Sequence, residues 1–210
     1  KDVRVVVLAG RGRHFCAGND LPEFQSLDPE NSPGRMLEVR EAFFAIQDAP
    51  VPVIGAVHGA ALGTGLAIAA SCDFVVAAAG TRLGCPEISV GVMGGARHLM
   101  RLVPQPLARW MYFSGEPLAV EQLASLGSVL EVVPAEQLMK RAYERAGAIA
   151  RHSPVVLRFA KRSLNRVEEM PLQDGYAFEQ SLTGELSGHA DAKEALRAVV
   201  ERREPQYSGS

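Results

Sequence analysis

Apolar runs separated by glycine and proline set the pattern of the first half of the chain. Val3–Ala9 is an apolar run typical of a strand buried on both faces, and Val53–Val57 and Phe74–Ala79 predict two more strands. Gly34–Ala49 predicts a helix, which Pro50 and Pro52 end. Its apolar residues share one face: Met36, Val39, Ala42, Phe43 and Ile46. Gly84 and Pro86 give Thr81–Ser89 the signals of a turn.

Two glycine-bearing turns follow the first two of these runs. They read His14-Phe-Cys-Ala-Gly-Asn-Asp20 and His58-Gly-Ala-Ala-Leu-Gly-Thr-Gly65, and the second opens into a helix-like stretch at Leu66–Ala70. A strand followed by a glycine turn and a helix start aims backbone N–H groups at a developing negative charge. Two such turns in one domain predict two donors for one oxygen, which is typical of acyl-transfer or enolate chemistry.

The chain beyond Gly94-Gly95 has mostly helical periodicity. The predicted helices are His98–Val103, Pro106–Ser114, Val120–Leu126, Glu136–His152, Pro154–Val167, Gly175–Thr183 and Asp191–Arg203. Val129–Val133 predicts a short strand among them, and Ser153 before Pro154 is typical of a helix N-cap. Strand–helix alternation followed by a helical C-terminal third predicts an α/β fold.

Composition and charge narrow the class of protein. The 210 residues carry a net charge of −2 with no block of like charge, which argues against a nucleic-acid surface. Cys16, Cys72 and Cys85 lack CxxC spacing and are odd in number, so we expect reduced thiols of a cytoplasmic protein and no metal site. No run is long enough to cross a bilayer, so no membrane partner is expected. Because Lys1 directly precedes a core strand, we expect residues upstream of it.

Four segments resemble the successive motifs of the crotonase (enoyl-CoA hydratase/isomerase) superfamily. They are His14–Leu21, Ala56–Gly65, Cys72–Ala77 and Leu83–Ile88, and the tail matches at Ser153-Pro154, Ala160-Lys161, Asp191–Glu194 and Arg202–Tyr207. The resemblance implies a crotonase-like spiral of ββα turns over residues 1–133 and a helical trimerisation region over 134–210. It also implies an acyl-CoA substrate, with coenzyme A as part of that substrate and no permanently bound cofactor, in a homotrimer or a dimer of trimers. Members usually carry a further N-terminal strand and helix that contribute to coenzyme A binding.

The resemblance assigns an oxyanion hole to the backbone N–H groups of Asn19 and Thr64. Thr64 replaces the more usual glycine, but a change of side chain leaves a backbone donor in place. Substrate or CoA contacts are implied at Ala17, Gly18, Asp20, Leu21, Gly63, Pro86, Gly95 and Arg202. For Arg202, a solvated arginine in the last helical turn is an equally good interpretation.

The acid/base groups depart from the family pattern. A typical hydratase has two glutamates, and their positions here hold Ala67 and Glu87. Alanine cannot transfer a proton, so Glu87 is the one candidate general acid/base, and hydration would need a substitute such as His98, Asp20 or a water held by Glu87 alone. Dienoyl-CoA isomerases have an aspartate where this chain has Gly95, so that subgroup is not expected.

Several alternatives remain open at this level. One carboxylate suffices to shift a double bond in a CoA thioester, but a CoA-thioester hydrolase or decarboxylase would use the same oxyanion hole. A protein that binds acyl-CoA with weakened catalysis is the non-enzymatic alternative. Cys16 and Cys85 lie in the motif loops without a histidine at a recognisable spacing, which argues against a nucleophilic thiol. We expect the lid-like segment Glu23–Arg35 and the helix around Trp110 to line the acyl pocket.

Overall fold

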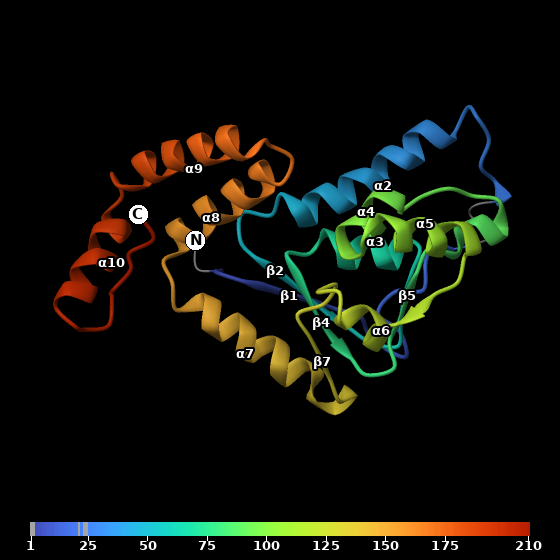
Figure 1. The fold of residues 1–210 in the computed structure, drawn as a ribbon, viewed down its shortest axis with the longest axis horizontal. Coiled ribbons are helices and arrows are strands. Elements are labelled where there is room, and N and C mark those ends of the chain that lie inside the picture. Colours follow the sequence, from blue (N-terminus) through green and yellow to red (C-terminus); the bar gives the residue numbers. More distant parts are fainter. Residues whose placement is uncertain (1–2, 21, 23–24) are drawn as a thin grey trace. The chain divides into compact units, whose positions relative to one another are not determined.

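The computed structural model describes residues 3–20, 22 and 25–210, so the expected contact at Leu21 lies outside the described residues. The chain divides into two compact units (Figure 1). One comprises the described part of Lys1–Val6 together with Asp48–Pro52 and Arg145–Ser210, and the other comprises Val7–Gln47 and Val53–Glu144. The two-domain division expected from the sequence, 1–133 and 134–210, stays a prediction.

The strands form two sheets, which places the chain in the α/β class. The larger sheet has the order β1 (Val6–Ala9), β2 (Val53–Val57), β4 (Phe74–Ala78) and β7 (Glu131–Val133), with β4 parallel to β2 and to β7. The smaller sheet has the order β3 (Ala60–Leu62), β5 (Arg82–Gly84) and β6 (Leu118–Ala119), with β3 and β5 parallel. β3 directly follows β2, so the chain leaves the larger sheet for the smaller one at the second glycine turn.

Three predictions of strands and turns need correction. The glycine turn expected over His58–Gly65 contains the strand β3, because its three residues pair with the distant strand β5. The strand expected over Val3–Ala9 begins at Val6, and it is not buried on both faces, since Val6 is 38% exposed. Among the described residues β1 is the end strand of its sheet, which leaves one of its edges uncovered by another strand. The turn expected over Thr81–Ser89 contains the strand β5, followed directly by the 3-10 helix η1 (Pro86–Val90).

The helices follow the predicted order along the chain. Their bounds are α2 Ser32–Gln47, α3 Thr64–Ser71, α4 Ala96–Leu102, α5 Gln105–Ser114, α6 Val120–Ala124, the 3-10 helix η2 Ala135–Gln137, α7 Leu138–Ala150, α8 Pro154–Val167, α9 Leu172–Leu186 and α10 Ala190–Val200. The predicted cap of α8 is confirmed, because Ser153 Oγ accepts the N–H groups of Val155 (3.1 Å) and Val156 (3.3 Å). None of the described helices is long and apolar enough to span a bilayer.

Helix α3 lies at the centre of the unit that contains both glycine turns. Leu66, Ala67, Ala69 and Ala70 are at most 2% exposed, and the helix packs against α2, α4 and β3. Small alanine side chains let these neighbouring elements approach the helix closely. The core therefore holds α3, and with it the second glycine turn, in one fixed place.

Candidate active site

The two glycine turns lie against one another. Phe15 N–H donates to the carbonyl of His58 (2.9 Å), and Cys16 N–H donates to that of Ala60 (3.1 Å). Leu62 N–H returns a hydrogen bond to the carbonyl of Cys16 (3.0 Å). These bonds extend the smaller sheet by a parallel bridge between Cys16 and Ala61. The two turns are therefore neighbours in the structure, and their supply of two donors to one oxygen stays a prediction.

Glycine is required where the turns touch. A Cβ atom on Gly65 would lie 2.0 Å from the carbonyl oxygen of Cys16, so no larger residue fits there. Gly63 precedes α3 with φ 54° and ψ −118°, a backbone conformation that L side chains disfavour. Together these glycines let α3 begin at Thr64 directly against the loop that carries Asn19. The unpaired N–H groups of a helix start favour negative charge nearby.

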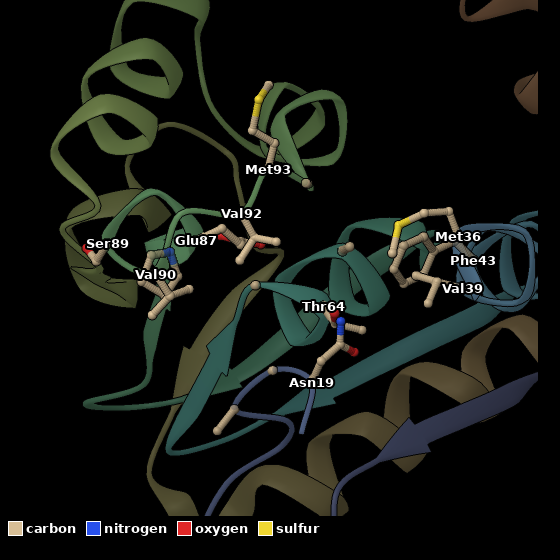
Figure 2. Close-up of a pocket in the computed structure, with 17 residues that line it drawn as sticks. Asn19, Met36, Val39, Phe43, Thr64, Glu87, Ser89, Val90, Val92 and Met93 are labelled. Carbon is tan, nitrogen blue, oxygen red and sulfur yellow. The ribbon is translucent and has the colours of Figure 1, made fainter. Parts of the chain in front are cut away.

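A cavity of about 430 Å³ opens at this junction (Figure 2). It is lined by Ala17, Gly18, Asn19, Met36, Val39, Phe43, Gly63, Thr64, Ala67, Pro86, Glu87, Ser89, Val90, Val92, Met93, Gly94 and Gly95. Eight of the residues predicted for the site are in this set: Ala17, Gly18, Asn19, Gly63, Thr64, Pro86, Glu87 and Gly95. The structure thus brings residues from four separate segments of the chain around one space.

Two other residues predicted to contact CoA are not among the lining residues. Asp20 is exposed, and Arg202 has φ 55° and belongs to the unit that contains Arg145–Ser210. Their contacts with CoA stay predictions. Neither Trp110 nor a described residue of Glu23–Arg35 lines this cavity, and their place in the acyl pocket stays a prediction. Met36, Val39 and Phe43 of α2 form a wall of the cavity, because their spacing puts them on one face of the helix.

The carboxyl group of Glu87 lies between Gly63 of the second glycine turn and Gly95. A Cβ atom on Gly63 would be 3.0 Å from Glu87 Oε1, and one on Gly95 would be 3.6 Å from it. Glu87 Oε2 is buried and has no hydrogen-bond partner among the described residues. Burial raises the pKa of Glu87 above its usual value and outweighs a hydrogen bond with its own backbone. A partly buried carboxyl with a raised pKa beside a helix start suits proton transfer.

Tyr112 forms a hydrogen bond with the glycine pair Gly94-Gly95. Its phenol oxygen accepts the N–H of Gly94 at 3.1 Å, and Gly94 and Gly95 both line the cavity. Tyr112 lies in α5, the helix around Trp110 that was expected to line the acyl pocket. Its neighbours Trp110 and Phe113 are exposed by 47% and 63%. Tyr112 thus ties α5 to the turn beside Glu87, which a helical period alone could not indicate.

Ala67 presents only a methyl group to the cavity. It lies in the first turn of α3, is 1% exposed, and lines the cavity near Thr64. Neither of the two side chains proposed as substitutes, His98 and Asp20, is among the lining residues, and a water held by Glu87 stays a prediction. His98 instead packs edge-on against Phe43, with ring centroids 4.8 Å apart. Burial, with the nearby charges of Arg101 and Arg97, lowers the pKa of His98 and keeps its ring neutral near neutral pH.

The thiol next to the site is not poised as a nucleophile. Cys85 is buried, and burial together with the charge of Glu87 raises the pKa of its thiol to about 12. A thiol with so high a pKa stays protonated at neutral pH, and the thiolate is the reactive form. Among the described residues, no cluster of three or more His, Cys, Asp or Glu side chains is placed to hold a metal ion.

The raised pKa of Glu87 predicts a pH-dependent stability difference. The native state holds this proton more tightly than the unfolded chain does, so the ionised carboxyl destabilises the fold once the pH exceeds the raised pKa. Below the ordinary glutamate value of about 4.3 both states are protonated and the effect vanishes. We expect Glu87→Gln to raise Tm relative to the wild type at about pH 8 and to lose that advantage near pH 4.

Thermal unfolding at both pH values measures this difference. Glu116→Gln is the matched control, because Glu116 is exposed and should give wild-type Tm at either pH. A Glu87→Gln variant less stable than the wild type at the higher pH would contradict the unpaired burial of this carboxyl.

Comparison with known proteins relates the chain to a family. A family model described as enoyl-CoA hydratase/isomerase matches residues 1–210. The chain is 36% identical over 211 residues to 2,3-dehydroadipyl-CoA hydratase of Escherichia coli (strain K12), covering 99% of this chain and 82% of that protein. It is 33% identical over 208 residues to the short-chain-enoyl-CoA hydratase of Clostridium acetobutylicum, covering 96% of this chain and 79% of that protein.

Two further matches extend the comparison. The chain is 35% identical over 209 residues to (7aS)-7a-methyl-1,5-dioxo-2,3,5,6,7,7a-hexahydro-1H-indene-carboxyl-CoA hydrolase of Rhodococcus jostii (strain RHA1), covering 98% of this chain and 80% of that protein. Its structure resembles the crystal structure of enoyl-CoA hydratase from Bacillus anthracis with a TM-score of 0.92 and 31% identity, covering 99% of this chain and 82% of that one. The crotonase-like fold expected from the motifs is confirmed.

Proposed function

Because this chain belongs to the enoyl-CoA hydratase/isomerase family, we propose that it shifts the double bond of an enoyl-CoA thioester with Glu87 as its acid/base group. The observation that carries the proposal is that the positions of the family's two glutamates hold one glutamate, Glu87, and one alanine, Ala67. Among the described lining residues Glu87 is the one ionisable side chain, and the position of the usual second glutamate offers only a methyl group. An isomerase needs one group that takes a proton and returns it elsewhere.

The thioester carbonyl would bind between the N–H groups of Asn19 and Thr64. Both residues line the cavity, and Thr64 is the first residue of α3. Glu87 takes a proton from the α-carbon of a β,γ-enoyl-CoA, and the electron pair moves onto the thioester oxygen to give a dienolate. The two N–H groups stabilise that charge together with the helix dipole. Glu87 then returns the proton to the γ-carbon, which gives the conjugated α,β-enoyl-CoA with no net change in atoms.

The surroundings of Glu87 match these two steps. Its raised pKa makes the carboxylate a stronger base for the α-proton, and the protonated form is then held long enough to deliver the proton to the γ-carbon. Adding water to an α,β-enoyl-CoA requires a further group that positions the nucleophile. Ala67 cannot do this, so we propose that hydration is the slower reaction of this site.

Restoring the missing carboxylate tests that proposal. We expect Ala67→Glu to raise the rate of crotonyl-CoA hydration by about a hundredfold, because a second general acid/base typically contributes about 10²–10⁴-fold. Formation of the hydroxyacyl-CoA product, followed by chromatography, measures the change. Ala67→Gln is the matched control, since it fills the same space without a titratable group and should leave hydration slow. Rapid hydration by the wild type, unchanged in both variants, would contradict the role given to Ala67.

A second candidate activity is hydrolysis of a CoA substrate. The Rhodococcus relative is named as a CoA hydrolase, and an oxyanion hole would stabilise the negative charge in that reaction too. Decarboxylation through a thioester enolate is a further reaction of the same class. Product analysis with β-keto and malonyl-type CoA substrates separates these activities from isomerisation, and binding without any turnover would favour the acyl-CoA-binding alternative.

The coenzyme A moiety is carried by the substrate in this proposal, with no separately bound cofactor. The homotrimer or dimer of trimers and the cytoplasmic location implied by the resemblance also stay predictions. Exposed apolar side chains on α9 and α10 support an assembly, among them Leu172, Leu196 and Val199, which are 69–87% exposed. A mass measurement in solution that gives a monomer would contradict it.

A further inference from the structure

One face of α2 forms an apolar wall of the cavity. Met36, Val39 and Phe43 follow each other at intervals of three and four residues, which places them on the same side of the helix. Figure 2 shows their side chains projecting together from α2, with Val90 and Val92 across the view from them. No α2 residue is fully buried, so this face does not pack completely into the protein core. It is an apolar surface available to a ligand.

The side chains that line the cavity disfavour an anionic acyl group, and Arg97 and Arg101, whose charges act on His98, are not among them. Glu87 is the one ionisable side chain among the described lining residues, and the other polar side chains there are Asn19, Thr64 and Ser89. The imidazole of His98 packs on the ring of Phe43 behind this wall and is neutral near neutral pH. A second carboxylate carried into the cavity would therefore lose its hydration, meet apolar side chains, and be repelled by Glu87.

We infer that the site selects acyl-CoA thioesters whose acyl chain is uncharged, and discriminates against acyl chains that end in a carboxylate. The inference rests on the proposed function only in placing the thioester carbonyl at Asn19 and Thr64. From that position the acyl chain extends along the α2 wall. Met36, Val39 and Phe43 are then the residues that determine acyl specificity.

Binding of a matched ligand pair tests this inference directly. Hexanoyl-CoA and adipyl-CoA have acyl chains of the same carbon number and differ only in a terminal methyl or carboxylate. We expect calorimetry to give a Kd for hexanoyl-CoA at least about tenfold below that for adipyl-CoA, since an unpaired carboxylate in an apolar site is strongly disfavoured. Equal affinities, or tighter binding of adipyl-CoA, would overturn the inference. Absence of binding by both would overturn it together with the acyl-CoA site.

A positive charge added to the α2 wall provides a second test of the inference. Met36 is 41% exposed, so Met36→Lys can be accommodated without burying the new ammonium group. It should strengthen adipyl-CoA binding and reduce the preference for hexanoyl-CoA to about threefold or less, because the ammonium group pairs with the terminal carboxylate. Leu37→Lys is the matched control: Leu37 is 42% exposed on the same helix but does not line the cavity, and its variant should keep the wild-type preference. The same shift in both variants would contradict a specific role for the α2 wall.

These binding measurements separate the inference from the proposed reaction. Tight, selective binding of hexanoyl-CoA with no conversion of β,γ-hexenoyl-CoA would contradict the isomerase function and support the acyl preference. Turnover of β,γ-hexenoyl-CoA with equal affinity for hexanoyl-CoA and adipyl-CoA would support the isomerase function and contradict the acyl preference.

Discussion

Replacing Glu87 by glutamine is expected to lower kcat/KM for the double-bond shift by about a thousandfold, within the range of about 10²–10⁴ for general acid/base catalysis. The amide has nearly the size of the carboxyl but cannot accept the α-proton. No other ionisable side chain among the described lining residues can replace it. The rise in absorbance of the conjugated thioester, as a β,γ-enoyl-CoA is converted, measures the loss.

Two controls make that result specific to Glu87. Glu116→Gln removes an exposed carboxylate on the same unit and should keep wild-type turnover. The Glu87→Gln variant should still bind hexanoyl-CoA, since the apolar wall and the helix start are unchanged. Wild-type turnover by Glu87→Gln would remove Glu87 from the reaction and with it the proposed mechanism.

Removing one backbone donor is expected to have the second large effect. Thr64 is the first residue of α3, a position where proline is tolerated because its N–H has no partner within the helix. Thr64→Pro deletes the proposed oxyanion donor and is expected to lower kcat by about 100–1000-fold. Gly63, with φ 54° and ψ −118°, lies outside the α-helical region that a following proline disfavours. The helix start should therefore persist.

The matched control for this donor is Thr64→Ala, which keeps the N–H and loses only the side chain. It should turn over the substrate at close to the wild-type rate. Equal losses in the alanine and proline variants would assign the effect to the hydroxyl group or to local packing. A proline variant with wild-type kcat and wild-type Tm would exclude Thr64 N–H as a donor.

The spacing of glycines along the sequence predicted the two glycine turns of the candidate site. Glycines at positions such as Gly63 and Gly65 serve backbone geometry that few other residues can adopt, so their spacing carried structural information directly. Glu87, in the motif Leu83–Ile88, lies in the cavity lining, and its role as acid/base group stays a prediction. What these motifs could not show is the burial of the carboxyl, which depends on Gly94 and Gly95 folding back over it.

The apolar wall of α2 shows what hydrophobic periodicity in the sequence cannot predict. Met36, Val39 and Phe43 were predicted to share one helix face, and they do, but periodicity does not reveal what that face contacts. Such a face usually packs into the core, whereas here it borders an open cavity. Strand β5 was missed for a related reason: three residues that pair only with distant segments carry too short a pattern to be distinguished from a turn.

The central claim is that one carboxyl group both removes and returns the migrating proton, and isotope transfer tests it most directly. A β,γ-enoyl-CoA deuterated at the α-carbon is converted in ordinary water, and the product is analysed for deuterium at the γ-carbon. The account predicts that a measurable fraction of the γ-hydrogen is deuterium, because the partly buried carboxyl of Glu87 returns the proton before full exchange with solvent. A product whose γ-position carries only solvent hydrogen, or a hydroxyacyl-CoA as the main product, would contradict it.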